Sequence, residues 1–146
     1  MLIRDMQLRD IRAVAEIEKE CFTQPWSAKS FEDSINRDDT VFFVCYNEET
    51  SDVLGYIGMY ISFDEAEITN VAVAPDYRGC GFAEMLVEAA KETAATLGVT
   101  QIFLEVRKSN DPAISLYKKT GFEEIGIRRN FYQRPTEDAK LMKVGI

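Results

Sequence analysis

The chain has 146 residues, of which 46% are apolar and 29% charged, a composition typical of a single globular domain with its own core. Its formal net charge of -8 disfavours general binding to a nucleic-acid backbone and favours a basic or cationic partner. The absence of histidine excludes His-based catalytic triads, His general bases and H-E-x-x-H metal sites. Acid–base chemistry must therefore come from carboxylates, Tyr, Lys, Cys or a chain terminus, and we expect no metal.

The expected compartment is the cytoplasm. No stretch is long and apolar enough to span a membrane, and the N-terminal segment MLIRDMQLRD lacks the apolar run of a signal peptide. Cys21, Cys45 and Cys80 form no C-x-x-C motif and cannot all pair with one another, which agrees with a reducing environment. We expect these cysteines to be buried structural thiols and expect no membrane partner.

The first part of the chain predicts one strand and two helices, followed by a meander. Residues 1–4 are expected to form a short edge strand, and apolar residues at helical spacing predict a helix over residues 8–22. Ser27 is the expected N-cap of a second helix at residues 28–35. Three antiparallel strands are then expected at residues 40–46, 53–62 and 66–74.

The next segment predicts a helix followed by a strand. The apolar face of this helix is expected to comprise Leu86, Ala89, Ala90, Thr93 and Leu97, and Gly98 is its expected stop. A strand at residues 101–107 follows, with Leu104 on one face and Glu105 on the other. The order strand, helix, strand favours a parallel crossover connection.

The last segment predicts one helix and a hairpin. Asp111 is the expected N-cap of the helix and Gly121 its expected stop. Strands at residues 122–130 and 139–146 are expected to pair around a loop at residues 131–138.

The stretch VAPDYRGCGFAEML, residues 73–86, places two glycines between an apolar strand and a helix. Glycine lets the backbone approach a ligand closely, and the start of a helix offers unpaired N–H groups and a positive dipole end. The stretch therefore favours a phosphate-binding site.

Arg78, Gly81 and Ala83 in this stretch resemble the R/Q-x-x-G-x-G/A signature with which the GNAT family of N-acetyltransferases binds the pyrophosphate of acetyl-CoA. The segment NDPAISLYKKTGF resembles the second CoA-contacting segment of that family, and the order of elements agrees over nearly the whole chain. The resemblance implies a single GNAT domain over residues 1–146: an α/β fold with a mostly antiparallel mixed sheet, a splayed parallel pair and flanking helices. It also implies acetyl-CoA as co-substrate.

Three further segments, CFTQPWSAKSF, FLEVRKSN and IRRNFY, resemble the RimI branch of the family, the ribosomal-protein-alanine N-acetyltransferases. This implies acetylation of a protein N-terminus, with a basic ribosomal protein as partner and no direct nucleic-acid contact. An acetyltransferase for lysine or a small amine, and a non-catalytic acyl-CoA-binding module, remain alternatives. A Rossmann unit is disfavoured because the glycine loop follows a three-strand meander.

Two residues are candidates for the chemistry. Glu105 lies in an otherwise apolar strand, where desolvation raises the pKa of a carboxylate, and it is the expected base for the acceptor amine; the resemblance implies that role, through a water. Tyr117 is protonated at neutral pH and can donate to the departing thiolate. The alternatives are a solvent-facing carboxylate at Glu105 and ordinary helix packing by Tyr117.

The expected acetyl-CoA contacts follow mainly from backbone geometry. If the strand ending in NVAV splays from its parallel neighbour, the main-chain groups of Val71 and Val73 can bind the pantetheine arm, and an N–H there can hold the oxyanion. The resemblance adds Asn110, whose alternative role is helix entry, and Cys80 is expected to be a loop residue without covalent chemistry. The full expected set is Val71, Ala72, Val73, Arg78, Gly79, Cys80, Gly81, Phe82, Ala83, Asn110 and Tyr117.

The resemblance implies that the acceptor enters from the side opposite acetyl-CoA, between TQPWS and FYQRPTED. Trp26, Phe131 and Tyr132 offer flat walls for a peptide, and Glu137 and Asp138 are possible partners for a cation. The alternative is that these aromatic residues only cap the sheet and that the acidic pair is a solvated turn.

Overall fold

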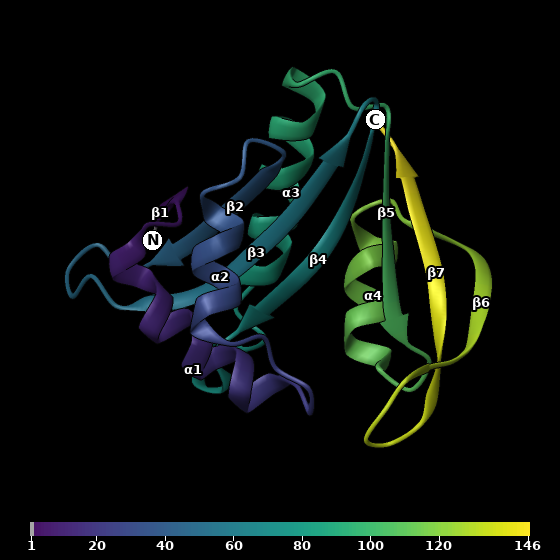
Figure 1. The fold of residues 1–146 in the computed structure, drawn as a ribbon, viewed down its shortest axis with the longest axis horizontal. Coiled ribbons are helices and arrows are strands. Elements are labelled where there is room, and N and C mark those ends of the chain that lie inside the picture. Colours follow the sequence, from purple (N-terminus) through teal and green to yellow (C-terminus); the bar gives the residue numbers. More distant parts are fainter. Residues whose placement is uncertain (1) are drawn as a thin grey trace.

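The computed structural model describes residues 2–146 and contains one seven-stranded sheet with helices on both faces (Figure 1). The strands are β1 (Leu2–Asp5), β2 (Thr40–Tyr46), β3 (Val53–Ser62), β4 (Glu65–Val73), β5 (Gln101–Arg107), β6 (Glu123–Tyr132) and β7 (Glu137–Gly145). The helices are α1 (Ile11–Cys21), α2 (Ala28–Ile35), α3 (Phe82–Thr96) and α4 (Asp111–Lys119), with short 3₁₀ turns η1 (Leu8–Asp10) and η2 (Pro75–Tyr77). The strand order is β1-β2-β3-β4-β5-β7-β6, and among these described strands only β4 and β5 run parallel. The predicted α/β fold with a mixed sheet is confirmed.

Two apolar cores lie on opposite faces of the sheet. Leu86 of α3 and Ile114 of α4 belong to the larger core, together with Ile102 of β5. Val14 of α1 and Phe31 of α2 belong to the smaller core. No helix within residues 2–146 is both long and apolar enough to cross a membrane.

The parallel pair β4–β5 separates along its length, as expected. The two strands are in register from Glu65 opposite Gln101 to Glu67 opposite Phe103, and the pairing ends there. Both strands continue, β4 to Val73 and β5 to its last residue, and Figure 1 shows them diverging. Because the second half of β4 has no neighbour on this side, its backbone groups are available to a ligand.

A β-bulge changes which face the second half of β4 presents. Gly58 of β3 is opposite Asn70 while Met59 is opposite Ile68, so Thr69 is an extra residue in β4. Ile68 consequently packs in the α3-side core, whereas Asn70 reaches Glu18 of α1 on the other face. Strict alternation would have placed both side chains on one face.

Helix boundaries agree with the sequence in most places. Ser27 caps α2 by accepting a hydrogen bond from the Ser30 N–H, as expected. The predicted first helix is shorter than expected, because residues 8–10 form the turn η1 and Leu8 is 60% exposed. The predicted first strand falls at β1, and Met1 lies outside the described residues.

Two predictions for the later helices, the cap of α4 and the buried face of α3, were wrong. Asn110, not Asp111, caps α4, because its side-chain oxygen accepts the Ala113 N–H at 3.2 Å. The buried face of α3 comprises Leu86, Val87, Ala90 and Ala94. Leu97, assigned to this face, is 55% exposed because the helix ends before it.

The final hairpin is longer than expected. Tyr132 of β6 pairs with Glu137 of β7, so the connecting turn contains only residues 133–136. Phe131 and Asp138 therefore lie on strands, whereas the polar composition of residues 131–138 had predicted a loop. The pairing persists because the irregularity is absorbed inside β6, where Asn130 has φ 53° between the paired residues Arg128 and Tyr132.

Candidate active site

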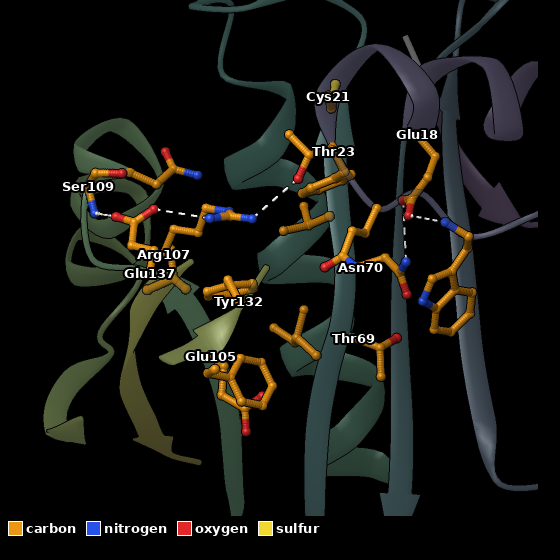
Figure 2. A pocket seen from close by; sticks show the side chains of 18 of the residues that line it. Glu18, Cys21, Thr23, Thr69, Asn70, Glu105, Arg107, Ser109, Tyr132 and Glu137 are labelled. Carbon is orange, nitrogen blue, oxygen red and sulfur yellow. Dashed lines mark hydrogen bonds and ion pairs between the residues drawn. The ribbon is translucent and has the colours of Figure 1, made fainter. Parts of the chain in front are cut away.

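A pocket of about 550 Å³ opens where β4 and β5 diverge (Figure 2). Its walls come from the segment between α1 and α2, from the second halves of β4 and β5, and from the β6–β7 hairpin. Residues assigned a role from the sequence that line the pocket are Trp26, Val71, Glu105, Asn110, Phe131, Tyr132 and Glu137. Assigned residues outside its lining are Ala72, Val73, Arg78, Gly79, Cys80, Gly81, Phe82, Ala83, Tyr117 and Asp138. The structure thus brings the candidate base together with the proposed acceptor walls.

Glu105 lies on β5 in a partly desolvated position, with its side chain 17% exposed. Burial raises the pKa of this carboxyl above its ordinary value, and the negative charge of Glu67 raises it further. Arg128 opposes the shift, since its guanidinium lies 3.5 Å from Glu105 Oε1. A carboxylate with a raised pKa is a stronger base, so the position suits proton abstraction from an amine.

The two charged neighbours of Glu105 should move the pH profile in opposite directions. Glu67→Gln removes a charge that raises the pKa of Glu105, so the acid limb of kcat should shift to lower pH. Arg128→Gln removes the cation that lowers this pKa, and the same limb should shift to higher pH. Turnover measured across pH with saturating acceptor checks both variants, and shifts in the same direction would exclude Glu105 as the titrating group.

Tyr117 of α4 is buried and packs edge-on against Phe122, with ring centroids 5.7 Å apart. Burial raises the pKa of its phenol, and Tyr132 adds to the shift. The ring therefore packs in the core as the simpler interpretation expected, while its hydroxyl keeps its proton at neutral pH.

The glycine loop has the backbone geometry of an anion site. Gly79 and Gly81 adopt positive φ angles of 77° and 85°, and a Cβ on either would meet nothing within 4 Å. The first hydrogen bond of α3 runs from the Met85 N–H to the Gly81 carbonyl. The N–H groups of the residues just before Met85 therefore make no hydrogen bond within the helix. These groups and the dipole of α3 fit a phosphate of acetyl-CoA.

Arg78 is turned toward the end of β4. Its Nε donates to the Val73 carbonyl at 3.4 Å, and its Nη2 donates to Cys21 Sγ at 3.0 Å. The expectation of three buried thiols is correct only for Cys45. Cys21 is partly buried at the end of α1, and Cys80 is exposed because it lies between the two loop glycines.

The acidic pair of the hairpin is already engaged by protein groups. Glu137 accepts the Ser109 N–H at 2.7 Å and pairs with Arg107 at 3.2 Å. Hydrogen bonding from Ser109, with help from Arg107, holds the pKa of Glu137 below its ordinary value. Asp138 accepts the Asn130 N–H at 2.9 Å. Binding of a substrate cation by either carboxylate would have to compete with these contacts.

The sequence model of the Acetyltransferase (GNAT) family matches residues 11–122. The chain belongs to the GNAT acetyltransferase family. The [ribosomal protein bS18]-alanine N-acetyltransferase of Escherichia coli (strain K12) is 34% identical over 148 residues, covering 99% of this chain and 97% of the relative. A Bacillus subtilis (strain 168) relative, provisionally given the same name, is 40% identical over 144 residues, covering 99% of this chain and 95% of the relative.

Solved structures agree with this membership. The crystal structure of the ribosomal-protein-S18-alanine N-acetyltransferase from Escherichia coli superposes with a TM-score of 0.90 at 33% identity, covering 99% of this chain and 93% of that one. The resemblance to the GNAT family and to its RimI branch, stated from the motifs, is therefore confirmed.

Arg107 is a residue of this GNAT site to which the sequence assigned no role. Its guanidinium pairs with Glu137, donates to the Gln133 carbonyl at 2.7 Å and reaches the Thr23 hydroxyl at 3.3 Å. It also lies 4.6 Å from the centre of the Tyr132 ring (Figure 2). Arg107 thereby joins the hairpin to the α1–α2 segment across the pocket. No local sequence pattern marked Arg107, because its partners Thr23, Gln133 and Glu137 are distant from it in the sequence.

Glu18 of α1 is a second residue of the site to which the sequence analysis assigned no role. It is only 2% exposed and accepts hydrogen bonds from the Tyr56 hydroxyl, the Trp26 N–H at 2.8 Å and Asn70 Nδ2 at 3.3 Å. Burial, together with Glu18, raises the pKa of Tyr56. A signal was present in the sequence, because Glu18 is four residues after Val14 and therefore falls on the apolar stripe of α1.

Proposed function

We propose that this chain is an acetyl-CoA-dependent N-α-acetyltransferase that acts in the cytoplasm on the N-terminal alanine of a ribosomal protein. The observation that carries the proposal is the position of Glu105, a base with a raised pKa inside a pocket whose walls include Trp26, Phe131 and Tyr132. Relatives named as [ribosomal protein bS18]-alanine N-acetyltransferases support the choice of acceptor.

The residues present fit acetyl-CoA, which would supply the acetyl thioester. The unpaired N–H groups between Gly79 and Ala83 would hold the pyrophosphate, and the free edge of β4 near Val71 would bind the peptide-like arm. An N–H on this edge would also stabilise the oxyanion that develops at the thioester carbonyl. Asn110, at the pocket wall, caps α4 and can add a side-chain contact.

Proton transfer is the task of two side chains. An α-amino group has a pKa of about 7.7 to 8.0 and is largely protonated at neutral pH. A base must therefore remove a proton before the amine attacks the thioester. Glu105 takes this proton, through a water. Tyr117 holds its own proton well above neutral pH and donates it to the departing sulfur.

The flat aromatic walls of the pocket favour a peptide acceptor over other amines. The rings of Phe131 and Tyr132 meet at right angles with centroids 5.0 Å apart, and burial raises the pKa of Tyr132 to about 12. The net charge of -8 favours an acceptor with a basic residue close to its N-terminus. A lysine side chain or a small polyamine would use less of this surface.

A peptide beginning Ala-Arg-Tyr-Phe should therefore be acetylated at its α-amino group, faster than the same peptide with Glu at the second position. The rate on the Arg peptide should fall as salt rises, because exposed charge interactions are screened. Mass spectrometry locates the acetyl group. Modification of a lysine side chain alone, equal rates for the two peptides, or turnover of free lysine, polyamines or aminoglycosides but not of peptides would contradict the proposed acceptor.

A further inference from the structure

Asn70 is a buried polar residue in the wall of the pocket that the chemistry above does not use. Its side chain is 6% exposed, and its Oδ1 is a fully buried oxygen without a hydrogen-bond partner within residues 2–146. A buried amide oxygen without a donor is costly, so a native structure that keeps one calls for an explanation. Since Asn70 lines the pocket, a donor on a bound ligand can supply the missing hydrogen bond after a small shift of the buried amide toward the pocket.

The orientation of this amide is set by Glu18. The carboxylate of Glu18 only accepts hydrogen bonds, so the nitrogen of the Asn70 amide must face it, at 3.3 Å from Oε1. Glu18 is itself held by the Tyr56 hydroxyl and by the Trp26 N–H. Figure 2 shows the amide nitrogen directed at Glu18 and the oxygen turned away from it.

The bulge at Thr69 places the amide on the acceptor side of the sheet. It moves Asn70 to the face that carries α1, where the pocket also contains Glu105. The negative charge of Glu18 behind the amide polarises it and makes Oδ1 a better acceptor. The missing partner is consequently a donor, and a cationic or amide N–H suits it.

We propose that Asn70 Oδ1 accepts a hydrogen bond from an N–H of the acceptor's amino-terminal residues, with Glu18 as the residue that positions the amide. This rests on the proposed function, which places an amine in the same pocket. The donor is either the α-amine or the first peptide N–H. Asn70 thereby selects acceptors that present an N–H at this point and orients the amine beside Glu105.

The first test is Asn70→Leu, which keeps a similar volume and removes the acceptor atom. The KM for the Ala-Arg-Tyr-Phe peptide should rise about tenfold, while the Kd for acetyl-CoA by calorimetry stays within about twofold. Thr40→Val is the control, because it removes a partly buried hydrogen bond, from the Thr40 hydroxyl to the Ser34 carbonyl, that lies outside the pocket lining. It should lower the Tm and leave KM within about twofold. Equal KM values for Asn70→Leu and the wild type would overturn the proposal.

The second test uses modified peptides. One carries an N-methyl group on the α-amine and the other on the first peptide nitrogen. In the wild type, one of the two should lose about tenfold in kcat/KM, and in Asn70→Leu that penalty should shrink to about twofold. Equal penalties in both proteins would show that Asn70 does not receive the hydrogen bond, and a wild-type penalty at neither position would overturn the proposal even if the Leu variant does not fold.

The two proposals fail separately. If the wild type acetylates a polyamine and no peptide, the proposed acceptor is wrong. The ratio of KM between Asn70→Leu and the wild type on that polyamine then still decides whether Asn70 contacts the amine.

Discussion

Glu105→Gln is expected to lower kcat by about 100-fold or more at pH 7, because a general base contributes roughly that much to a proton-transfer step. Gln keeps the shape of the side chain and cannot take the proton. The loss should shrink at higher pH, where a larger fraction of the α-amine, with its pKa of about 7.7 to 8.0, is already neutral. Steady-state turnover at saturating peptide between pH 6 and pH 9 measures both effects.

Tyr117→Phe is the comparison for this variant. Its hydroxyl is assigned to the departing thiolate, so turnover should fall without recovery at high pH. Glu105→Gln should bind acetyl-CoA with wild-type affinity, since Glu105 is not among the residues expected to contact it. Full turnover by Glu105→Gln, with the chemical step rate-limiting, would remove Glu105 from the mechanism.

Gly81→Val is expected to weaken acetyl-CoA binding by about 100-fold or more. Gly81 has φ 85°, a conformation that a β-branched residue adopts at a cost of about 1–3 kcal/mol. Its Cβ would project into the open space ahead of α3, where the pyrophosphate is expected to approach the backbone. Calorimetric titration with acetyl-CoA measures the loss.

Gly98→Val is the control that separates the backbone strain of Gly81→Val from the blocked approach of the pyrophosphate. Gly98 follows α3 at its other end, has φ 84°, and a Cβ there also meets nothing within 4 Å. The backbone strain is therefore matched, while the position is remote from the glycine loop. Both variants should lower the Tm by similar amounts, and only Gly81→Val should lose affinity. Wild-type affinity in Gly81→Val, or an equal loss in Gly98→Val, would show that this loop does not bind the pyrophosphate.

Several features of this protein were determined by short segments of the sequence. The Ser27 cap and the positive φ angles of Gly79 and Gly81 depend on contacts within a few residues. Such features are encoded locally, so patterns of caps, glycines and apolar spacing reveal them. The pocket walls could be named for the same reason, because the motifs that carry them occupy short stretches in a known order.

The tertiary structure decided the rest, because the responsible contacts join residues far apart in the chain. The bulge at Thr69 exists only in the pairing of β4 with β3, and it alone turns Asn70 toward α1. The links from Arg107 to the hairpin, and from Glu18 to Asn70 across 52 residues, depend on the same packing. A single sequence shows which side chains are polar. Which of them are buried, paired, or left without a partner beside the pocket depends on how the sheet brings distant segments together.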